Sequence, residues 1–263
     1  MIIAMWSGPR NLSTALMRSF ANRSDVTKVL DEPFYAAYLK ETNKNHPMKE
    51  DVLAHQSSSW EDVKKICLTH DPFGITYQKH MTQHMLQEDL SWINNLTNCF
   101  LIRNPKYVVK SFIESWSEGG LLDMGFLQQA EIFKLVCKNT TSIPVVIDAD
   151  LLREDPERVL RAFCSHINLP WDKNMLKWEK GLKDYDGIWA EHWYPSVNTS
   201  DCITVSLNLR YVACTISAKI FAKAAISSIS ISRSAQFGSF RASKRSAIAF
   251  LTISGLRIMR AFG

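Results

Sequence analysis

The sequence of 263 residues lacks several features that would assign a protein to a broad class at once. It has no run of about 18 uninterrupted apolar residues, so a membrane-spanning segment is not expected. No basic stretch precedes an apolar segment at the N-terminus, so no signal peptide is expected. The six cysteines are scattered without a CxxC pair, which argues against a zinc or dithiol redox motif. We therefore expect reduced thiols, no metal and a cytoplasmic location.

Acidic residues are absent from residues 202–263. Nine of the 31 Lys and Arg residues lie there, so residues 1–201 carry 22 basic against 26 acidic residues. The net charge of +5 thus gives no general argument for binding nucleic acid. We predict one domain over residues 1–200, followed by an atypical basic, Ser-rich tail over residues 201–263 that is a candidate for disorder. An arm for a membrane surface or an acidic partner is the alternative interpretation of this tail.

Short apolar runs alternate with helical patterns along most of the chain. The expected strands are Met1–Trp6, Thr27–Leu30, Gly74–Lys79, Asn98–Ile102 and Ile143–Ile147. The expected helices include Ala15–Phe20, Lys106–Trp116, Met124–Cys137 and Arg158–Ile167. This alternation predicts an α/β fold of three layers, in which a central parallel sheet of about five strands is flanked by helices. Ligands of such sheets bind beyond the carboxyl ends of the strands. The polar residues expected there are Arg10, Glu32, Lys79, His80, Arg103, Asp148 and Asp150.

A polar turn follows the first expected strand and leads directly into the first expected helix. It reads Gly8-Pro9-Arg10-Asn11-Leu12-Ser13-Thr14. The first N–H groups of a helix lack partners and the helix dipole is positive there, so this turn predicts an anion site. A loop that binds nucleoside triphosphates, GxxxxGK followed by Ser or Thr, would place Lys where Ser13 stands and Gly where Leu12 stands. The absence of that Lys disfavours a kinase, and the cation here is Arg10.

A second polar group follows the fourth expected strand. Arg103 ends this strand, where a buried guanidinium is costly without an anion. Asn104 and Pro105 mark a helix start, because Asn caps and Pro fits the first turn. Ser111 follows Asn104 by two helical turns and shares its face, so Arg103 and Ser111 can approach one phosphate. The alternative is that Arg103 pairs with a carboxylate and Ser111 merely packs.

These segments resemble motifs of sulfotransferases that use 3′-phosphoadenosine 5′-phosphosulfate (PAPS). The turn is similar to the family's Pro-Lys/Arg-Ser-Gly-Thr-Thr loop, although Asn11 and Leu12 depart from the commonest pattern. The segment from Arg103 to Ser111 is similar to the Arg-Asn/Asp-Pro…Ser motif for the donor's 3′-phosphate, and residues 148–170 resemble the late strand–helix segment. The resemblance covers roughly residues 1–195. It implies a P-loop-type fold, PAPS as donor with PAP as product, no metal, and a small-molecule acceptor.

The resemblance also implies that a base takes the proton of the acceptor while Arg10 and the loop amides hold the sulfuryl group. Glu32 stands where tyrosylprotein-type relatives carry a catalytic Glu. His80 resembles the His in the Lys-Thr-His of cytosolic relatives, but the motif is one residue shorter here, and a one-residue change can reverse a side chain's direction. Glu32 and His80 remain equal candidates for the base, with His84 third.

The sequence therefore predicts a PAPS-dependent sulfotransferase acting on a hydroxyl or amine of an acceptor that the sequence does not identify. The catalytic candidates are Arg10, Glu32 and His80. The candidates for donor binding are Gly8, Pro9, Arg10, Asn11, Leu12, Ser13, Thr14, Arg103 and Ser111. The alternatives are a P-loop kinase of small metabolites and a catalytically inactive nucleotide-binding module.

Overall fold

The computed structural model of the chain describes residues 1–86, 89–116, 119–140, 143–204, 248–253 and 256–261. Its strands are β1 (Ile2–Ser7), β2 (Val26–Asp31), β3 (Ile75–Met81), β4 (Thr97–Ile102), β5 (Val145–Asp148), β6 (Ile248–Ile253) and β7 (Leu256–Ala261). Its α-helices are α1 (Ser13–Ala21), α2 (Tyr35–Thr42), α3 (Lys49–His55), α4 (Trp60–Leu68), α5 (Pro105–Ser115), α6 (Phe126–Asn139), α7 (Ala149–Glu154), α8 (Pro156–His166), α9 (Ala190–Trp193) and α10 (Pro195–Asn198). Short 3-10 helices are η1 (Thr82–His84), η2 (Ser91–Asn95), η3 (Leu121–Met124) and η4 (Lys173–Leu176). Among the described residues, no helix has the length and apolar character needed to cross a bilayer.

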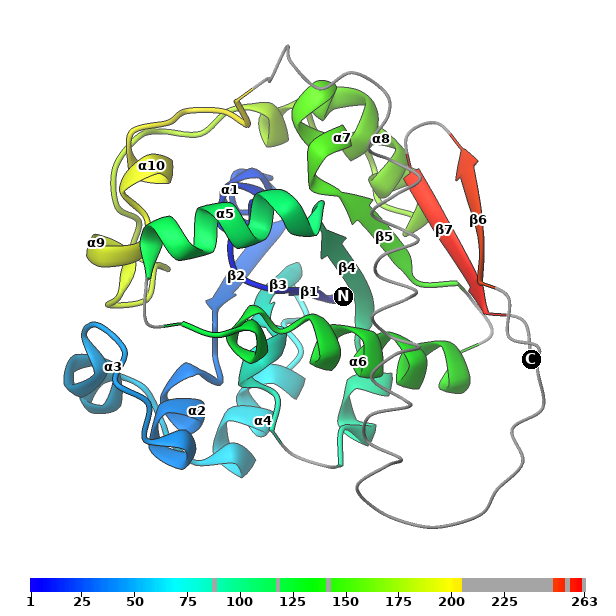
Figure 1. Cartoon of the computed structure of the whole chain (residues 1–263). Helices are drawn as coiled ribbons and strands as arrows, with labels where there is room; N and C mark the ends of the chain where they lie inside the picture. Colours follow the sequence, from blue (N-terminus) through cyan, green and yellow to red (C-terminus); the bar gives the residue numbers. More distant parts are fainter. Residues whose placement is uncertain (87–88, 117–118, 141–142, 205–247, 254–255, 262–263) are drawn as a thin grey trace, which may run out of the picture.

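The strands form one sheet in the order β2-β3-β1-β4-β5-β7-β6, and β1 to β5 run parallel (Figure 1). The predicted α/β fold with a parallel sheet of about five strands is confirmed. β7 pairs antiparallel with β5 through Arg257 and Val146, so a hairpin from the predicted tail extends the sheet. Residues 205–247 of that tail lie outside the described residues, and the predicted domain boundary at residue 200 stays a prediction.

Helices cover both faces of the sheet, as Figure 1 shows. One core packs α1, α7 and α8 against the first face, where alternate residues of β1 and β3 such as Met5 and Tyr77 point. The other core packs α4, α6 and η2 against the opposite face, where Trp6 of β1 lies. Apolar side chains on both faces of parallel strands explain why these strands read as nearly continuous apolar runs.

The helix start expected from Asn104 and Pro105 is confirmed. The Asn104 side chain accepts a hydrogen bond from the Lys106 amide at 3.0 Å, and Pro105 occupies the first turn of α5. Asp155 likewise caps α8 by accepting from the Arg158 amide at 3.1 Å. Local side-chain chemistry thus sets the start of the helix that carries Ser111.

Strand β3 runs two residues further than the predicted end at Lys79. All seven of its residues are buried. Because successive side chains of a strand point to opposite faces, Lys79 and His80 lie on different sides of the sheet. This difference decides which of the two reaches the site.

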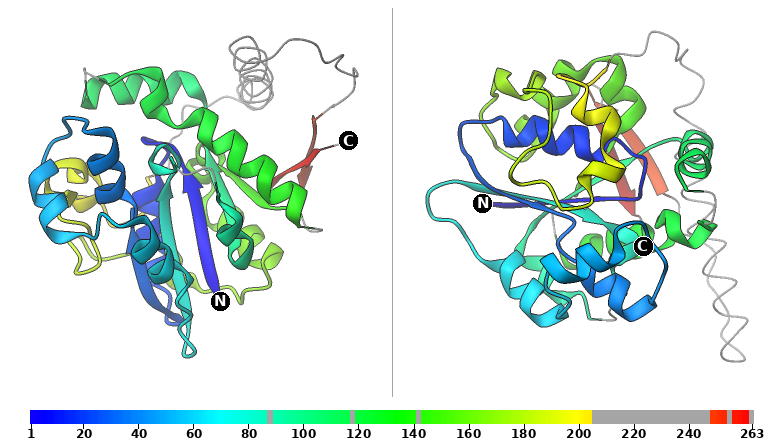
Figure 2. Two further views of the ribbon diagram at one scale, coloured as in Figure 1. Left: turned by 90° about the horizontal axis from the view of Figure 1, so that it is seen from below. Right: turned by 90° about the vertical axis from the view of Figure 1, so that its left-hand side faces the viewer.

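The segment of residues 173–204 packs along α1, and Figure 2 shows it beside that helix. Arg18 of α1 forms a bidentate ion pair with Asp186, in which one nitrogen–oxygen distance is 2.6 Å. The side chains of Arg18 and Asp186 are 0 % and 4 % exposed. Ser19 donates to the Met175 carbonyl at 2.6 Å. The segment is therefore held on the helix that begins at the predicted anion-binding turn.

We expect Arg18→Met to lower the free energy of unfolding by about 3–5 kcal/mol, because it leaves the Asp186 carboxylate buried without its cation. Lys134→Met is the matched control, since Lys134 forms an exposed pair with Glu131 at 2.8 Å. Loss of such a surface pair costs about 1 kcal/mol or less. Urea denaturation of both variants measures the difference, and equal losses would show that the Arg18 pair does not anchor the segment.

Candidate active site

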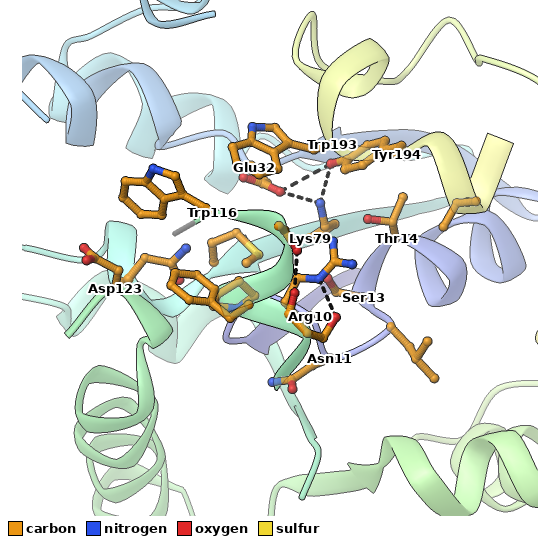
Figure 3. A pocket seen from close by; sticks show the side chains of 18 of the residues that line it. Arg10, Asn11, Ser13, Thr14, Glu32, Lys79, Trp116, Asp123, Trp193 and Tyr194 are labelled. Carbon is orange, nitrogen blue, oxygen red and sulfur yellow. Dashed lines mark hydrogen bonds and ion pairs between the residues drawn. The ribbon is translucent and has the colours of Figure 1, made fainter. Parts of the chain in front are cut away.

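A cavity of about 220 Å³ lies at the carboxyl ends of β1 to β4. Figure 3 shows Arg10, Asn11, Ser13 and Thr14 on one side of it, with Trp116 and Asp123 across from them. The walls are formed by Pro9, Arg10, Asn11, Leu12, Ser13, Thr14, Ala15, Glu32, Tyr35, His46, Lys79, Met81, Gln83, His84, Arg103, Ser111, Phe112, Ser115, Trp116, Asp123, Trp193, Tyr194, Ser196 and Val197. Across the described residues, no three His, Cys, Asp or Glu side chains gather in a way that would hold a metal ion.

The turn after β1 has an unusual backbone for a segment without glycine at the key positions. Arg10 and Leu12 have φ values of 64° and 66°, in the left-handed region. Alternation of this kind turns successive N–H groups toward one concave side, which suits an anion. Gly8 is required for a different reason: a Cβ there would lie 2.3 Å from the Met124 carbonyl oxygen. The turn is thus shaped by strained backbone and by close contact with η3.

The two arginines predicted for anion binding meet at this turn because β1 and β4 are neighbours in the sheet. Arg103 donates to the Arg10 carbonyl at 2.8 Å, and Arg10 Nε donates to Ser111 Oγ at 2.9 Å. Burial lowers the pKa of both guanidiniums, and Arg103 lowers that of Arg10 further. Asp150 lies 3.6 Å from Arg103 and compensates only part of this charge. A surplus of partly buried positive charge is typical of an anion site.

Opposite the arginines, Lys79 lies in a buried ionic cluster. Its Nζ lies 2.9 Å from Asp31 Oδ1 and 2.5 Å from Glu32 Oε1. Lys79 also donates to the Tyr194 hydroxyl at 2.5 Å, and that hydroxyl lies 2.8 Å from Asp31 Oδ2. Burial lowers the pKa of Lys79, but the two carboxylates outweigh burial and raise it above its ordinary value. Figure 3 shows Glu32 and Tyr194 converging on this amine.

Glu32 reaches Lys79 because its backbone adopts a left-handed conformation. Asp31 and Lys79 are register partners in β2 and β3, so their side chains share a face. A further extended residue would point away, yet Glu32 has a φ of 45° and its carboxylate turns to the same amine. Burial raises the pKa of Glu32, as does Asp31, while Lys79 lowers it, and the net direction is upward. A carboxylate with a raised pKa is a stronger base than an exposed one.

His80, the other predicted base, does not line this cavity. Its ring stacks on Trp6 with centroids 4.3 Å apart, in the core on the opposite face of the sheet. Its Nε2 lies 2.9 Å from Gln78 Oε1, and burial lowers its pKa to about 3. His84, the third candidate, does line the cavity, but burial lowers its pKa well below the ordinary value. The structure therefore brings Glu32 to the cavity and leaves His80 outside it, for the reason of strand alternation.

Several residues of the site had no predicted role. Lys79 was expected only at a strand end, although a lysine inside an apolar strand was a signal that it needed a buried counter-charge. Tyr194 and Trp193 come from a segment more than 100 residues away, and no sequence pattern connects them to Glu32. His46 and Trp116 reach the cavity from loops and helix ends, whose placement depends on tertiary packing.

We expect Gly8→Ala to weaken anion binding at the turn at least tenfold, because the added methyl must displace the Met124 carbonyl. The measurement is the rise in melting temperature with sodium sulfate at constant ionic strength. Gly120→Ala is the control, since its nearest atom beyond its chain neighbours would lie 3.6 Å away, an ordinary contact. Equal responses of the two variants to sulfate would contradict a binding role for the turn.

Comparison with known proteins identifies the family of the chain. Over about 200 residues the chain is 38% and 39% identical to the branched-chain-amino-acid aminotransferase-like proteins 2 and 1 of Arabidopsis thaliana. The match takes in 76% of this chain and about a third of those relatives (35% and 36%), so their names carry no activity over to it. A sulfotransferase domain from the olefin synthase of Synechococcus PCC 7002 shares the fold, with a TM-score of 0.50 at 13% identity, over 85% of this chain and 94% of that domain. Because the model of the sulfotransferase domain family matches residues 1–207, the chain belongs to the sulfotransferase domain family.

Proposed function

We propose that the protein transfers a sulfuryl group from PAPS to a hydroxyl or amine of a small molecule. The observation that carries the proposal is that a cationic turn and a carboxylate of raised pKa face one cavity. Family membership supports a transferase, while the donor and the acceptor are our assignment. When bound, the donor supplies a sulfuryl group joined to a phosphate through a bridging oxygen.

The residues of the turn fit an anionic donor. Both amide atoms of Asn11 are buried in the cavity wall without a hydrogen-bond partner among the described residues, which is costly unless a ligand uses them. Arg10 hydrogen-bonds to the neutral hydroxyl of Ser111, and Asp150 compensates only part of the charge of Arg103, so positive charge remains for a ligand. We assign Arg10 and the turn amides to the phosphosulfate end, and Arg103 with Ser111 to the 3′-phosphate.

Glu32 is our candidate for the base. During transfer the acceptor oxygen forms a bond to sulfur, the bond from sulfur to the bridging oxygen breaks, and the hydroxyl proton passes to the Glu32 carboxylate. Lys79 holds this carboxylate in place through Oε1, and the Tyr194 hydroxyl lies 3.3 Å from the same oxygen. The positive charge of Arg10 stabilises the negative charge that develops on the leaving phosphate.

The identity of the donor is tested by measuring the melting temperature of the protein with PAP, with ATP and Mg²⁺, or with GTP and Mg²⁺. A hundredfold excess of PAP over its Kd adds about 2.7 kcal/mol, which raises the melting temperature by roughly 5–10 °C for a chain of this size. We expect this rise with PAP and without Mg²⁺. Stabilisation by ATP with Mg²⁺ alone would favour the kinase, and PAP binding without any turnover of PAPS would favour the inactive module.

The base is tested by Glu32→Gln, which we expect to lower kcat roughly 10²–10⁴-fold while PAP affinity stays within about a factor of two. In the wild type, the active carboxylate is lost as pH falls through the raised pKa of Glu32. The acidic limb of the kcat profile should therefore lie above the ordinary Glu pKa, and it should vanish in the variant.

His80→Phe is the companion variant, because an aromatic ring at this position keeps the stacking on Trp6. We expect it to retain most of the wild-type kcat. Full turnover by Glu32→Gln, or a collapse of kcat in His80→Phe with PAP binding intact, would reverse the assignment of the base.

A further inference from the structure

The end of the cavity away from the cationic turn has aromatic walls. The Tyr35 and His84 rings stack with centroids 4.8 Å apart and planes 6° from parallel. His46 meets Trp116 edge to face, with centroids 4.5 Å apart, and accepts or donates a hydrogen bond with the Tyr35 hydroxyl at 2.9 Å. These side chains come from α2, η1, the end of α5 and the segment between α2 and α3. Flat walls of this kind suit a flat ligand.

Beyond the paired Glu32 and Lys79, this end of the cavity offers a ligand little charge. Burial lowers the pKa of His46 to about 4, and Lys44 adds to the effect. Burial, followed by the charge of His46, lowers the pKa of His84 well below its ordinary value. Both imidazoles are therefore neutral at pH 7. Asp123, the carboxylate of this wall, is already paired with Lys44 and accepts from the Gly120 amide at 2.8 Å.

The same wall contains polar atoms that the protein leaves unpaired. His46 Nε2, His84 Nδ1 and Gln83 Oε1 are buried without a hydrogen-bond partner among the described residues. A buried polar atom without a partner costs free energy, so three on one wall point to a ligand that completes them. The ligand must bring hydrogen-bonding groups but no charge, because neutral imidazoles cannot balance one.

We propose that this end is a charge-excluding acceptor subsite, in which His46, His84 and Trp116 select an uncharged, flat, hydroxylated molecule over charged analogues. This inference rests on the proposed function, because the ligand is identified as the acceptor by its place beside Glu32. Tyr35 lies three residues after Glu32 and its amide donates to the Glu32 carbonyl at 3.0 Å. Because Tyr35 and Glu32 line the same cavity, a ring bound in the subsite can bring its hydroxyl to the Glu32 carboxylate.

The test uses three probes with the same ring and hydroxyl: neutral 4-methylphenol, anionic 4-hydroxyphenylacetate and cationic tyramine. Binding to the full chain, with and without PAP, is followed by calorimetry or ligand-observed NMR at pH 7. We expect the neutral probe to bind at least tenfold more tightly than either charged one. Binding of all three with equal affinity, preference for a charged probe, or binding of none would overturn the charge-excluding subsite.

His46→Lys sharpens the test, because it places a cation on the subsite wall. We expect it to improve the affinity for 4-hydroxyphenylacetate at least tenfold relative to 4-methylphenol, with PAP affinity unchanged. His55→Lys, on the exposed end of α3, is the matched control and should alter neither ratio. If His46→Lys does not fold, the comparison of the three probes on the wild type still decides.

The outcomes separate the two proposals. PAP binding without the expected probe selectivity removes the subsite and leaves the donor assignment standing. Selective binding of the neutral probe without any PAP binding supports the subsite and removes the donor assignment. An unchanged preference in a folded His46→Lys variant would show that His46 does not face the ligand.

Discussion

The buried ammonium of Lys79 is the constraint on which the site depends. A charge that is only 1 % exposed is tolerated because two carboxylates and a tyrosine hydroxyl surround it. The cluster joins β2, β3 and the segment that carries Tyr194, so it holds these three parts together. One cation shared by Asp31 and Glu32 leaves the pair with more negative charge than it can balance. Burial raises the pKa of Glu32, and the charge of Asp31 raises it further.

The order of the strands separates this carboxylate from the cations of the cavity. Glu32 and Lys79 stand at the ends of β2 and β3, while Arg10 and Arg103 stand at the ends of β1 and β4. Arg10 is held by a neutral hydroxyl, that of Ser111, rather than by a carboxylate. The charge of Arg10 therefore stays available to a ligand, whereas Glu32 is paired with Lys79. A direct pair between Arg10 and Glu32 would have neutralised the charge of Arg10.

Local sequence patterns predicted much of the fold but only part of the site. Apolar runs predicted the strands, and Asn104 predicted the start of α5, because both signals act within a few residues. The sequence did not distinguish Glu32 from His80 as the base. The distinction depends on the two extra residues of β3 and on a left-handed backbone at Glu32. Neither has a sequence pattern, since only the packed sheet sets which face each side chain takes. The contact of Tyr194 with the site could not be predicted from local sequence patterns either.

The segment that carries Tyr194 also contacts both α1 and the ends of the strands that form the site. Asp186 of this segment forms an ion pair with Arg18 on α1, the helix that starts at the cationic turn. Its next residue, Gly187, donates its amide to Asp31 Oδ2 at 3.1 Å, beside the Lys79 cluster. Two adjacent residues thus tie the anion-binding half of the cavity to the carboxylate half. Displacing the segment would leave Arg18 buried without its carboxylate and would remove an N–H donor from Asp31, so both contacts hold the two halves in one relative position.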